Sequence, residues 1–417
     1  MSDQADRHQH YDVIVVGGGP AGSCTAGLLA AEGRHVLLLE REKFPRYHIG
    51  ESLITGVWPT LDRLGVRERL EGLGFVRKYG ASVLWGRDEE FWGFKFRQAG
   101  PYEYVHQVPR AEFDAVLLSR ARELGARVIE EATVQAPLLE GDRVTGVRYR
   151  VRGADADVEA RATVTVDASG QQRWLGRQLQ LVQWHEDLRN IAVWGYYQGC
   201  RRYEGERAGD TLIERLPGGW LWFIPLGHDT TSVGYVTPVA LMTASGRSPQ
   251  DLLADAIAGS AEVATMMQGA AMVSSHRTIK DWSYACTRFH GPGWALVGDA
   301  AAFVDPLLST GVTLAVRGAR FAALAIGRLL DDPAQEEEAL EAYERNSRTF
   351  LNSILEFVRF FYDQTKGREE YHAGAQEIID PEKQAPPEFD FVKLVSGLAC
   401  EDAELEMARP ATAAPVL

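Results

Sequence analysis

Residues 11–40 read YDVIVVGGGPAGSCTAGLLAAEGRHVLLLE. The apolar run Tyr11–Val16 is typical of a buried strand, the small residues of Pro20–Glu32 of a helix, and His35–Glu40 of a second buried strand. A glycine-rich turn with the spacing Gly-x-Gly-x-x-Gly separates the first strand from the helix. The order of strand, turn, helix and strand predicts a βαβ unit of the Rossmann type.

The glycine-rich turn predicts a site for the pyrophosphate of a dinucleotide. Its residues Gly17, Gly19, Ala21 and Gly22 allow the backbone to approach the phosphates at the start of the helix. Glu40 ends the second strand, where an acidic side chain accepts a hydrogen bond from the ribose. This spacing alone does not distinguish FAD from NAD.

The composition is that of a globular protein with a large core. The chain has 417 residues, of which 45% are hydrophobic, and its formal net charge of −14 argues against a nucleic-acid partner. We expect no signal peptide, no membrane span and a cytoplasmic location, because no apolar run approaches the required length. Four scattered cysteines indicate no metal site; they are Cys24, Cys200, Cys286 and Cys400.

A change of pattern along the chain predicts two domains. We expect helices over 54–73, 110–125, 311–330 and 336–363, and aromatic-rich strand segments over 191–198, 211–226 and 232–237. The predicted organisation is a nucleotide-binding domain over 1–175 and 291–330, a β-sheet substrate domain over 176–290, and a C-terminal helical segment with a flexible tail over 331–417. Residues 409–417 are expected to be disordered.

Two further motifs narrow the prediction. Gly298-Asp299 is followed by AAAFVDPLLSTGVTL over 300–314, and residues 220–225 read Trp-Leu-Trp-Phe-Ile-Pro. Together with the glycine-rich turn, these motifs resemble those of the flavin-dependent halogenases, and the resemblance covers roughly residues 10–375. It implies an α/β fold with a Rossmann-like FAD-binding domain of the aromatic hydroxylase and halogenase type, a second β-sheet domain and a helical C-terminal segment.

The resemblance implies a set of contacts with FAD. Asp299 is expected to bind the ribityl chain, and the helix that starts near Gly311 and Val312 to point its amides at the isoalloxazine. Arg46 and Ser52 belong to a segment that contacts the flavin, and Arg110 lies against the cofactor; a solvated helix start is the plainer interpretation of Arg110.

The resemblance also implies a halide site and a catalytic lysine. The amides of Thr310 and Gly311 are expected to hold chloride or bromide, whereas in a hydroxylase they would contact only flavin oxygen. Lys78 takes the position of the lysine that receives hypohalous acid, although a lysine of unknown surroundings is usually a surface charge. As an ammonium it would polarise the acid, and as a neutral amine it would form a chloramine.

Trp220 and Trp222 are expected on one face of a strand, since they are two residues apart. With Ile224 and Pro225 they resemble the wall that keeps the organic substrate away from the flavin. Core packing is the plainer interpretation of paired tryptophans, and also of the aromatic helix end at 357–362.

Leu308 stands where halogenases of free tryptophan carry a glutamate. The resemblance therefore implies an electron-rich phenol or pyrrole as substrate, carried on an acyl or peptidyl carrier protein, in natural-product biosynthesis. No residue is identified as a general base, and His48 is placed on the flavin side.

A single glycine-rich nucleotide motif predicts no NADH-binding domain. Reduced FAD is then expected from a separate flavin reductase. Three alternatives stay open: an FAD-dependent aromatic hydroxylase, a prenyl or enoyl reductase of the same superfamily, and a flavin-binding protein without catalytic activity.

Overall fold

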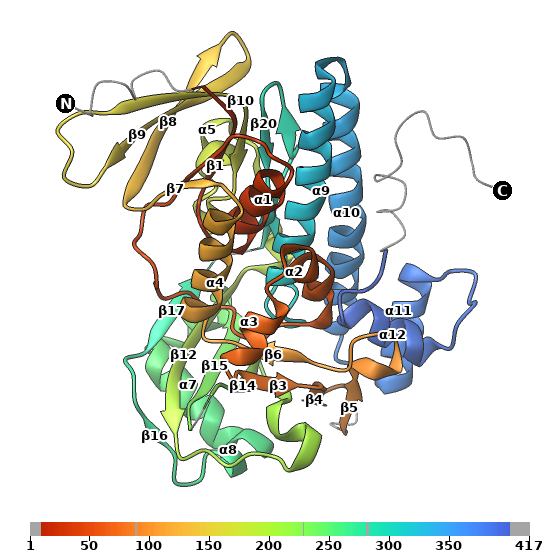
Figure 1. The fold of residues 1–417 in the computed structure, drawn as a ribbon. Helices are drawn as coiled ribbons and strands as arrows, with labels where there is room; N and C mark the ends of the chain where they lie inside the picture. Colours follow the sequence, from red (N-terminus) through yellow and green to blue (C-terminus); the bar gives the residue numbers. More distant parts are fainter. Residues whose placement is uncertain (1–9, 88–89, 228, 281–282, 401–417) are drawn as a thin grey trace.

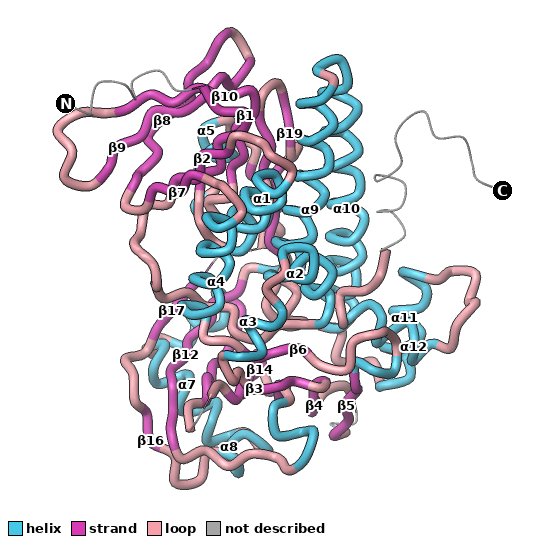
Figure 2. Tube along the Cα trace, viewed as in Figure 1, coloured by secondary structure: helices cyan, strands magenta, loops and turns pink. Residues whose placement is uncertain are grey.

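The computed structural model describes residues 10–87, 90–227, 229–280 and 283–400. Two eight-stranded sheets form its frame, and the first lies above the second in Figure 1. Long helices run beside the first sheet, and shorter helices cover the second, as the tube in Figure 2 shows.

The first sheet is centred on β1 (His10–Val16), which lies between β10 (Val158–Asp167) and β2 (Val36–Leu39) with all three strands parallel. Their continuous apolar runs suit strands that are covered on both faces. Val16 pairs with both Leu39 and Asp167, so the carboxyl ends of the strands meet at one edge of the sheet. The other strands are β7 (Arg127–Ile129), β8 (Ala132–Glu140), β9 (Arg143–Val151), β19 (His290–Gly291) and β20 (Trp294–Leu296).

Four helices build the layers next to the first sheet. They are α1 (Pro20–Ala31), α4 (Arg110–Glu123), α9 (Gly311–Asp331) and α10 (Glu336–Phe361). α1 packs against α4 and α9, and α9 packs against α10, which runs alongside it in Figure 1. The small residues of α9, such as Ala315, Ala319 and Ala322, are fully or almost fully buried, which allows this close packing.

The second sheet separates two hydrophobic clusters. On its site-facing side Trp220 and Trp222 join the main core, and on the other side Leu221 and Phe223 pack with residues of the covering helices. Its strands are β4 (Gly80–Leu84), β5 (Phe91–Lys95), β12 (Asn190–Gln198), β13 (Thr211–Leu216), β14 (Gly219–Pro225), β15 (Thr231–Pro238), β16 (Ala271–Met272) and β17 (Arg277–Lys280). The helices near it are α6 (Val239–Ser245), α7 (Pro249–Gly259) and α8 (Glu262–Met266).

Smaller elements complete the described chain. β3 (Val76–Lys78) pairs with β6 (Val105–Gln107), and a three-stranded sheet contains β11 (Val182–Trp184), β18 (Tyr284–Cys286) and β21 (Ala302–Phe303). The remaining α-helices are α2 (Trp58–Leu64), α3 (Arg67–Gly72), α5 (Trp174–Gln178), α11 (Arg368–Ile379) and α12 (Pro387–Val395). No helix within the described residues is long and apolar enough to cross a membrane.

The expected fold class is confirmed, with local differences. The helix expected over 54–73 is split, because Gly65 adopts a left-handed conformation that ends α2. The strand segment expected over 211–226 is a hairpin, because Gly218 turns the chain between β13 and β14 with a positive φ of 85°.

The second sheet also recruits residues that are distant from its main run. β4 pairs in parallel with β13 and antiparallel with β5, so both strands belong to this sheet although they fall within the first range expected for nucleotide binding. The domain boundaries themselves stay a prediction. Beyond residue 380, α12 packs Phe391 and Val395 into the core, and the predicted disorder at 409–417 falls outside the described residues.

Candidate functional site

A cavity of about 280 Å³ lies at the carboxyl edge of the first sheet and extends to the second sheet. Ligands of open α/β sheets bind at this edge. Most residues predicted for the site line this cavity: Gly17, Gly19, Ala21, Glu40, Arg46, Ser52, Arg110, Trp220, Trp222, Ile224, Asp299, Gly311 and Val312. Gly22, Lys78, Pro225 and Thr310 do not line it.

Two glycines of the glycine-rich turn have no room for a side chain. A Cβ atom on Gly22 would lie 1.9 Å from the carbonyl oxygen of Gly17, and one on Gly17 would lie 2.4 Å from that of Ala168. Glu40 holds the turn, since its Oε2 accepts a hydrogen bond of 2.7 Å from the Gly18 amide. At Gly17 and Gly19 the turn therefore brings backbone without a side chain to the cavity, as a pyrophosphate site requires.

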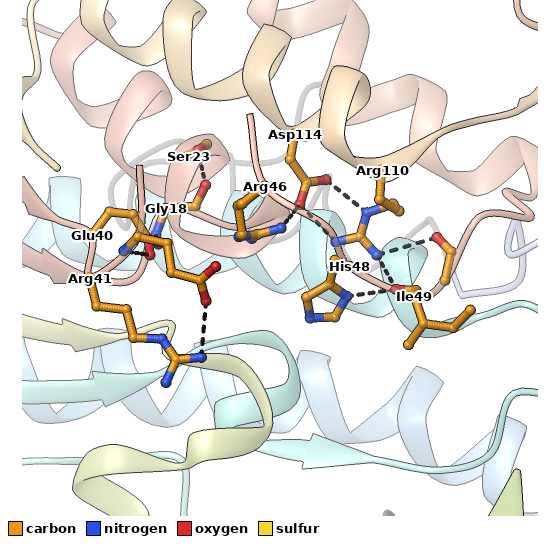
Figure 3. Close-up of polar contacts among 11 residues, drawn as sticks. Gly18, Ser23, Glu40, Arg41, Arg46, His48, Ile49, Arg110 and Asp114 are labelled. Atoms are coloured by element: carbon orange, nitrogen blue, oxygen red, sulfur yellow. Dashed lines mark hydrogen bonds and ion pairs between the residues drawn. The ribbon is translucent and has the colours of Figure 1, made fainter. Parts of the chain in front are cut away.

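Arg46 and Arg110 share one buried carboxylate, Asp114, as Figure 3 shows. Arg110 donates two hydrogen bonds to Asp114 (2.7 and 3.0 Å) and Arg46 donates one (2.8 Å). Burial by itself would raise the pKa of Asp114, but Arg110 and Arg46 hold it below its usual value. Arg110 also donates to the carbonyl oxygens of Ile49 and Gly50 at 2.8 and 3.2 Å.

Arg110 is therefore a buried anchor between α4 and the loop over residues 46–52, and not a solvated helix start. Sequence reasoning missed Asp114, although its place four residues after Arg110 on a helix was an available signal. His48 lines the cavity from this loop, and its Nδ1 donates to the Ile49 carbonyl.

The start of α9 brings backbone amides to the far end of the cavity. Ser309 has a left-handed φ of 57°, and Thr310 is the N-cap of this 21-residue helix. The Oγ1 atom of Thr310 is buried without a hydrogen-bond partner among the described residues. Nearby, desolvation raises the pKa of the Asp299 carboxyl to about 7, against the opposing effects of Arg110 and Gln171.

A second, smaller cavity of about 30 Å³ holds Lys78. The two cavities share four wall residues: Thr211, Ile213, Leu307 and Ser309. Lys78 is only 2% exposed, and its Nζ donates to Ser52 Oγ at 2.8 Å and to the Leu53 carbonyl at 2.9 Å. Since Ser52 lines the first cavity, it connects the lysine to that cavity directly.

The environment of Lys78 disfavours its charge. Burial lowers the pKa of its ammonium to about 7, and Asp210 opposes this shift only in part. The Asp210 carboxylate is itself paired with Lys95, at 3.0 Å. Burial thus favours the neutral amine of Lys78 more than water would.

The tryptophan wall is held by hydrogen bonds that the sequence did not reveal. Trp220 and Trp222 have ring centroids 6.1 Å apart. The indole of Trp220 donates to Tyr362 Oη at 2.8 Å, and that of Trp222 donates to Ser232 Oγ at 3.2 Å. Tyr362 donates in turn to Asp305, at 3.2 Å. The expected core role of the aromatic helix end is confirmed for Phe357 and Phe361, which are buried.

Comparison with known proteins identifies the family. A family model described as an FAD binding domain matches residues 10–358. The chain is 35% identical over 396 residues to a tryptophan 2-halogenase from Chondromyces crocatus, covering 93% of this chain and 75% of that protein. The chain belongs to the flavin-dependent halogenases.

Two further relatives agree with this assignment. This halogenase is 30% identical to a 1H-pyrrole-2-carbonyl-[peptidyl-carrier protein] chlorinase from Pseudomonas fluorescens, over 84% of this chain and 83% of that one. The solved myxobacterial chondrochloren halogenase, described as a new variant of FAD-dependent halogenases, superposes with a TM-score of 0.83 at 32% identity. That superposition covers 94% of this chain and 97% of the other.

The predicted resemblance, the enzyme class and the FAD cofactor are thereby confirmed. The cavity fits FAD, because Gly17 and Gly22 of its turn admit no Cβ atom and the unpartnered Thr310 hydroxyl adjoins it at the start of α9. The individual roles of the site residues stay predictions.

Proposed function

We propose that this halogenase transfers chlorine or bromine to an electron-rich phenol or pyrrole, and that Lys78 receives the hypohalous acid. The observation that carries this proposal is the burial of Lys78 in the second cavity, which adjoins the first cavity. Since the first cavity fits FAD, we call it the flavin cavity. A lysine is rarely buried without a specific role.

Each site residue has a role in this proposal. When bound, reduced FAD would supply two of the four electrons that oxygen takes up, and halide would supply the other two. Gly17, Gly19, Ala21, Gly22 and Glu40 hold its ADP half; Arg46, Ser52, Arg110, Asp299 and Val312 hold the flavin half. The amides of Thr310 and Gly311 hold the halide, since the first amides of a helix have no partner within the helix and lie at its positive end.

The second cavity suits hypohalous acid. Its volume of about 30 Å³ exceeds the roughly 10–15 Å³ that a water molecule requires. Lys78 supplies a hydrogen-bond donor there, and apolar side chains such as Ile54, Trp92 and Phe361 form much of the wall. Trp220, Trp222, Ile224 and Pro225 keep the organic substrate out of the flavin cavity.

We infer the substrate class from the side chains that line the second cavity. No carboxylate or histidine lines the second cavity among the described residues, and Leu308 is one of its walls. A ring halogenated from this cavity would lose its proton without help from a carboxylate or histidine of the cavity wall, which favours electron-rich rings. Relatives differ on this point: one is named for tryptophan and another for a pyrrole on a carrier protein. We favour a carrier-bound substrate.

The substrate is tested by turnover with mass spectrometry. The enzyme receives FAD, a flavin reductase, NADH, oxygen and either chloride or bromide, with free and carrier-bound phenols and pyrroles and with tryptophan. We expect a halogen isotope pattern on a phenol or pyrrole, stronger for the carrier-bound forms. Preferential halogenation of tryptophan, or gain of an oxygen atom without halide, contradicts the proposed substrate or reaction.

A separate flavin reductase is the proposed source of reduced FAD. The FAD-loaded halogenase alone is expected to leave NADH unconsumed, and addition of a reductase is expected to start turnover. Consumption of NADH by the halogenase alone contradicts this proposal.

A further inference from the structure

Glu51 is a buried carboxyl group that faces the flavin cavity. It is 4% exposed and lines the cavity beside Ser52. Its Oε1 accepts a hydrogen bond of 2.7 Å from the hydroxyl of Tyr196, and its buried Oε2 has no hydrogen bond of ordinary length with a described residue. None of the roles assigned above uses this group.

A chain of hydroxyl groups joins Glu51 to the surface. The single proton of the Tyr196 hydroxyl is donated to Glu51, so Tyr47 is the donor in the 2.8 Å hydrogen bond between the two tyrosines. Tyr47 Oη in turn accepts from the indole of Trp194 at 3.0 Å, and Tyr47 is 42% exposed. The hydroxyl protons of both tyrosines therefore point inwards, from solvent to the cavity.

The groups around Glu51 suit proton transfer near neutral pH. Burial raises the pKa of Glu51 to about 7. The hydroxyls of Tyr196 on β12 and Ser232 on β15 oppose this rise, as do the guanidinium groups of Arg110 on α4 and Arg277 on β17. Burial also raises the pKa values of Tyr47 and Tyr196, so both stay neutral hydroxyls.

Halide oxidation consumes a proton. The balance is FADH₂ + O₂ + X⁻ + H⁺ → FAD + HOX + H₂O, in which flavin and halide each give two electrons and oxygen takes four. Ring halogenation, ArH + HOX → ArX + H₂O, returns none of these protons. A proton must therefore enter the flavin cavity for every halogen transferred.

We propose that Glu51, Tyr196 and Tyr47 form the path by which this proton enters. Glu51 releases its carboxyl proton into the cavity and takes the hydroxyl proton of Tyr196. Tyr196 takes that of Tyr47, and Tyr47 takes one from solvent water. The path rests on the halide oxidation proposed above but not on the identity of the ring.

The first test measures the proton on Glu51 without turnover. Infrared difference spectra between wild type and Glu51→Gln isolate the carboxyl band, which is expected to titrate near pH 7. Tyr196→Phe is expected to raise this midpoint, because a hydrogen bond that favours the ionised form is lost. Tyr197→Phe is the matched control, since Tyr197 lies on the same strand but joins the hydrophobic cluster on its other face.

The second test measures the rate of hypohalous acid formation from reduced FAD, oxygen and bromide. General acid catalysis contributes about 10²-fold or more, so we expect a loss of that size in Glu51→Gln and about tenfold in Tyr196→Phe and Tyr47→Phe. The tyrosine variants should also show a larger solvent isotope effect with unchanged FAD affinity. Tyr197→Phe should match wild type.

The outcomes separate the two proposals. If wild type forms hypohalous acid and the Tyr47→Phe and Tyr196→Phe variants form it as fast as Tyr197→Phe, the proton path is wrong but halide oxidation stands. An infrared midpoint for Glu51 far from neutral pH has the same meaning. A wild type that forms no hypohalous acid contradicts halide oxidation, and with it the need for the proton.

Discussion

At the scale of single residues, the position of Lys78 disfavours its charged form and so destabilises the folded state. Its ammonium is fully removed from water, and its two hydrogen-bond acceptors, Ser52 Oγ and the Leu53 carbonyl, are both uncharged. The nearby carboxylate of Asp210 is paired with Lys95. A buried ammonium without a paired carboxylate does not stabilise the fold. The presence of Lys78 is therefore best explained by a role in the reaction.

The cost of burying Lys78 predicts a pH-dependent stability. Its pKa falls from 10.5 in the unfolded chain to about 7 in the folded one, so the unfolded state binds more protons between these values. The free energy of unfolding that this burial costs is greatest below pH 7, and the cost decreases as the pH rises towards 10.5. Lys78→Met should therefore stabilise the protein more at pH 6 than at pH 9, by roughly 3 kcal/mol.

Denaturant unfolding at both pH values checks this prediction. Lys280→Met, which changes an exposed lysine on β17, is the control and should show no such difference. An equal gain at the two pH values would mean that Lys78 keeps its ordinary pKa.

Among the elements, β14 and the end of α10 depend on one another. Tyr362 follows α10 directly. Its hydroxyl accepts a hydrogen bond from the Trp220 indole and donates one to the Asp305 carboxylate. Asp305 also accepts from the Leu307 amide, in the loop that leads to α9. Trp220 and the loop that leads to α9 are therefore held by the same hydrogen-bonded cluster.

Removal of the Tyr362 hydroxyl should loosen the wall. Tyr362→Phe leaves the buried indole nitrogen of Trp220 without its acceptor, which costs about 1–3 kcal/mol. We expect a lower melting temperature and a larger share of reduced flavin oxidised without halogen transfer. Tyr371→Phe removes a hydroxyl that donates to the Asp363 carbonyl and has no hydrogen bond to Trp220, so it should keep the wild-type share. If both variants oxidise the same share of reduced flavin without halogen transfer, Tyr362 has no role in the tryptophan wall.

In the whole molecule, segments far apart in the sequence close the second cavity. Ile54, Lys78, Leu308, Phe361 and Phe391 all line it. Phe391 comes from α12, and its ring packs against Trp92 and Phe94 of β5 and Phe357 of α10.

Opening this closure should release hypohalous acid. Phe391→Ala removes a ring that is 1% exposed, which costs roughly 3–5 kcal/mol and enlarges the cavity. We expect a lower melting temperature and more halogenation of an amine trap in solution at the expense of the ring substrate. Phe389→Ala on the same helix changes a residue that is 38% exposed and should behave as wild type. If Phe391→Ala halogenates the amine trap and the ring substrate in the wild-type ratio, α12 does not retain the hypohalous acid.

The sequence was sufficient for the parts of this molecule that depend on local pattern. The βαβ start, the glycine-rich turn and the shared face of Trp220 and Trp222 follow from strand and helix periodicity within a few residues. The motif resemblance then placed Lys78 and Asp299, both of which lie in cavity walls.

The parts that were missed join residues far apart in the chain. Tyr196 lies 145 positions from Glu51, and Tyr362 lies 142 from Trp220, so no local pattern pairs them. The parallel pairing of β4 with β13 is equally non-local, which is why β4 and β5 were not expected in the second sheet. The burial of α12 also depends on partners elsewhere in the chain.

The most direct measurement of the central proposal is the fate of the halogen in Lys78→Ala. Pre-reduced FAD, oxygen and bromide are supplied with a ring substrate found by the turnover assay and an amine trap in solution. We predict that flavin oxidation and total hypobromous acid stay near wild type while ring bromination falls by about 10²-fold or more and the trapped product rises. Ring bromination at the wild-type rate in Lys78→Ala would contradict the assignment of Lys78 as the residue that receives and delivers the halogen.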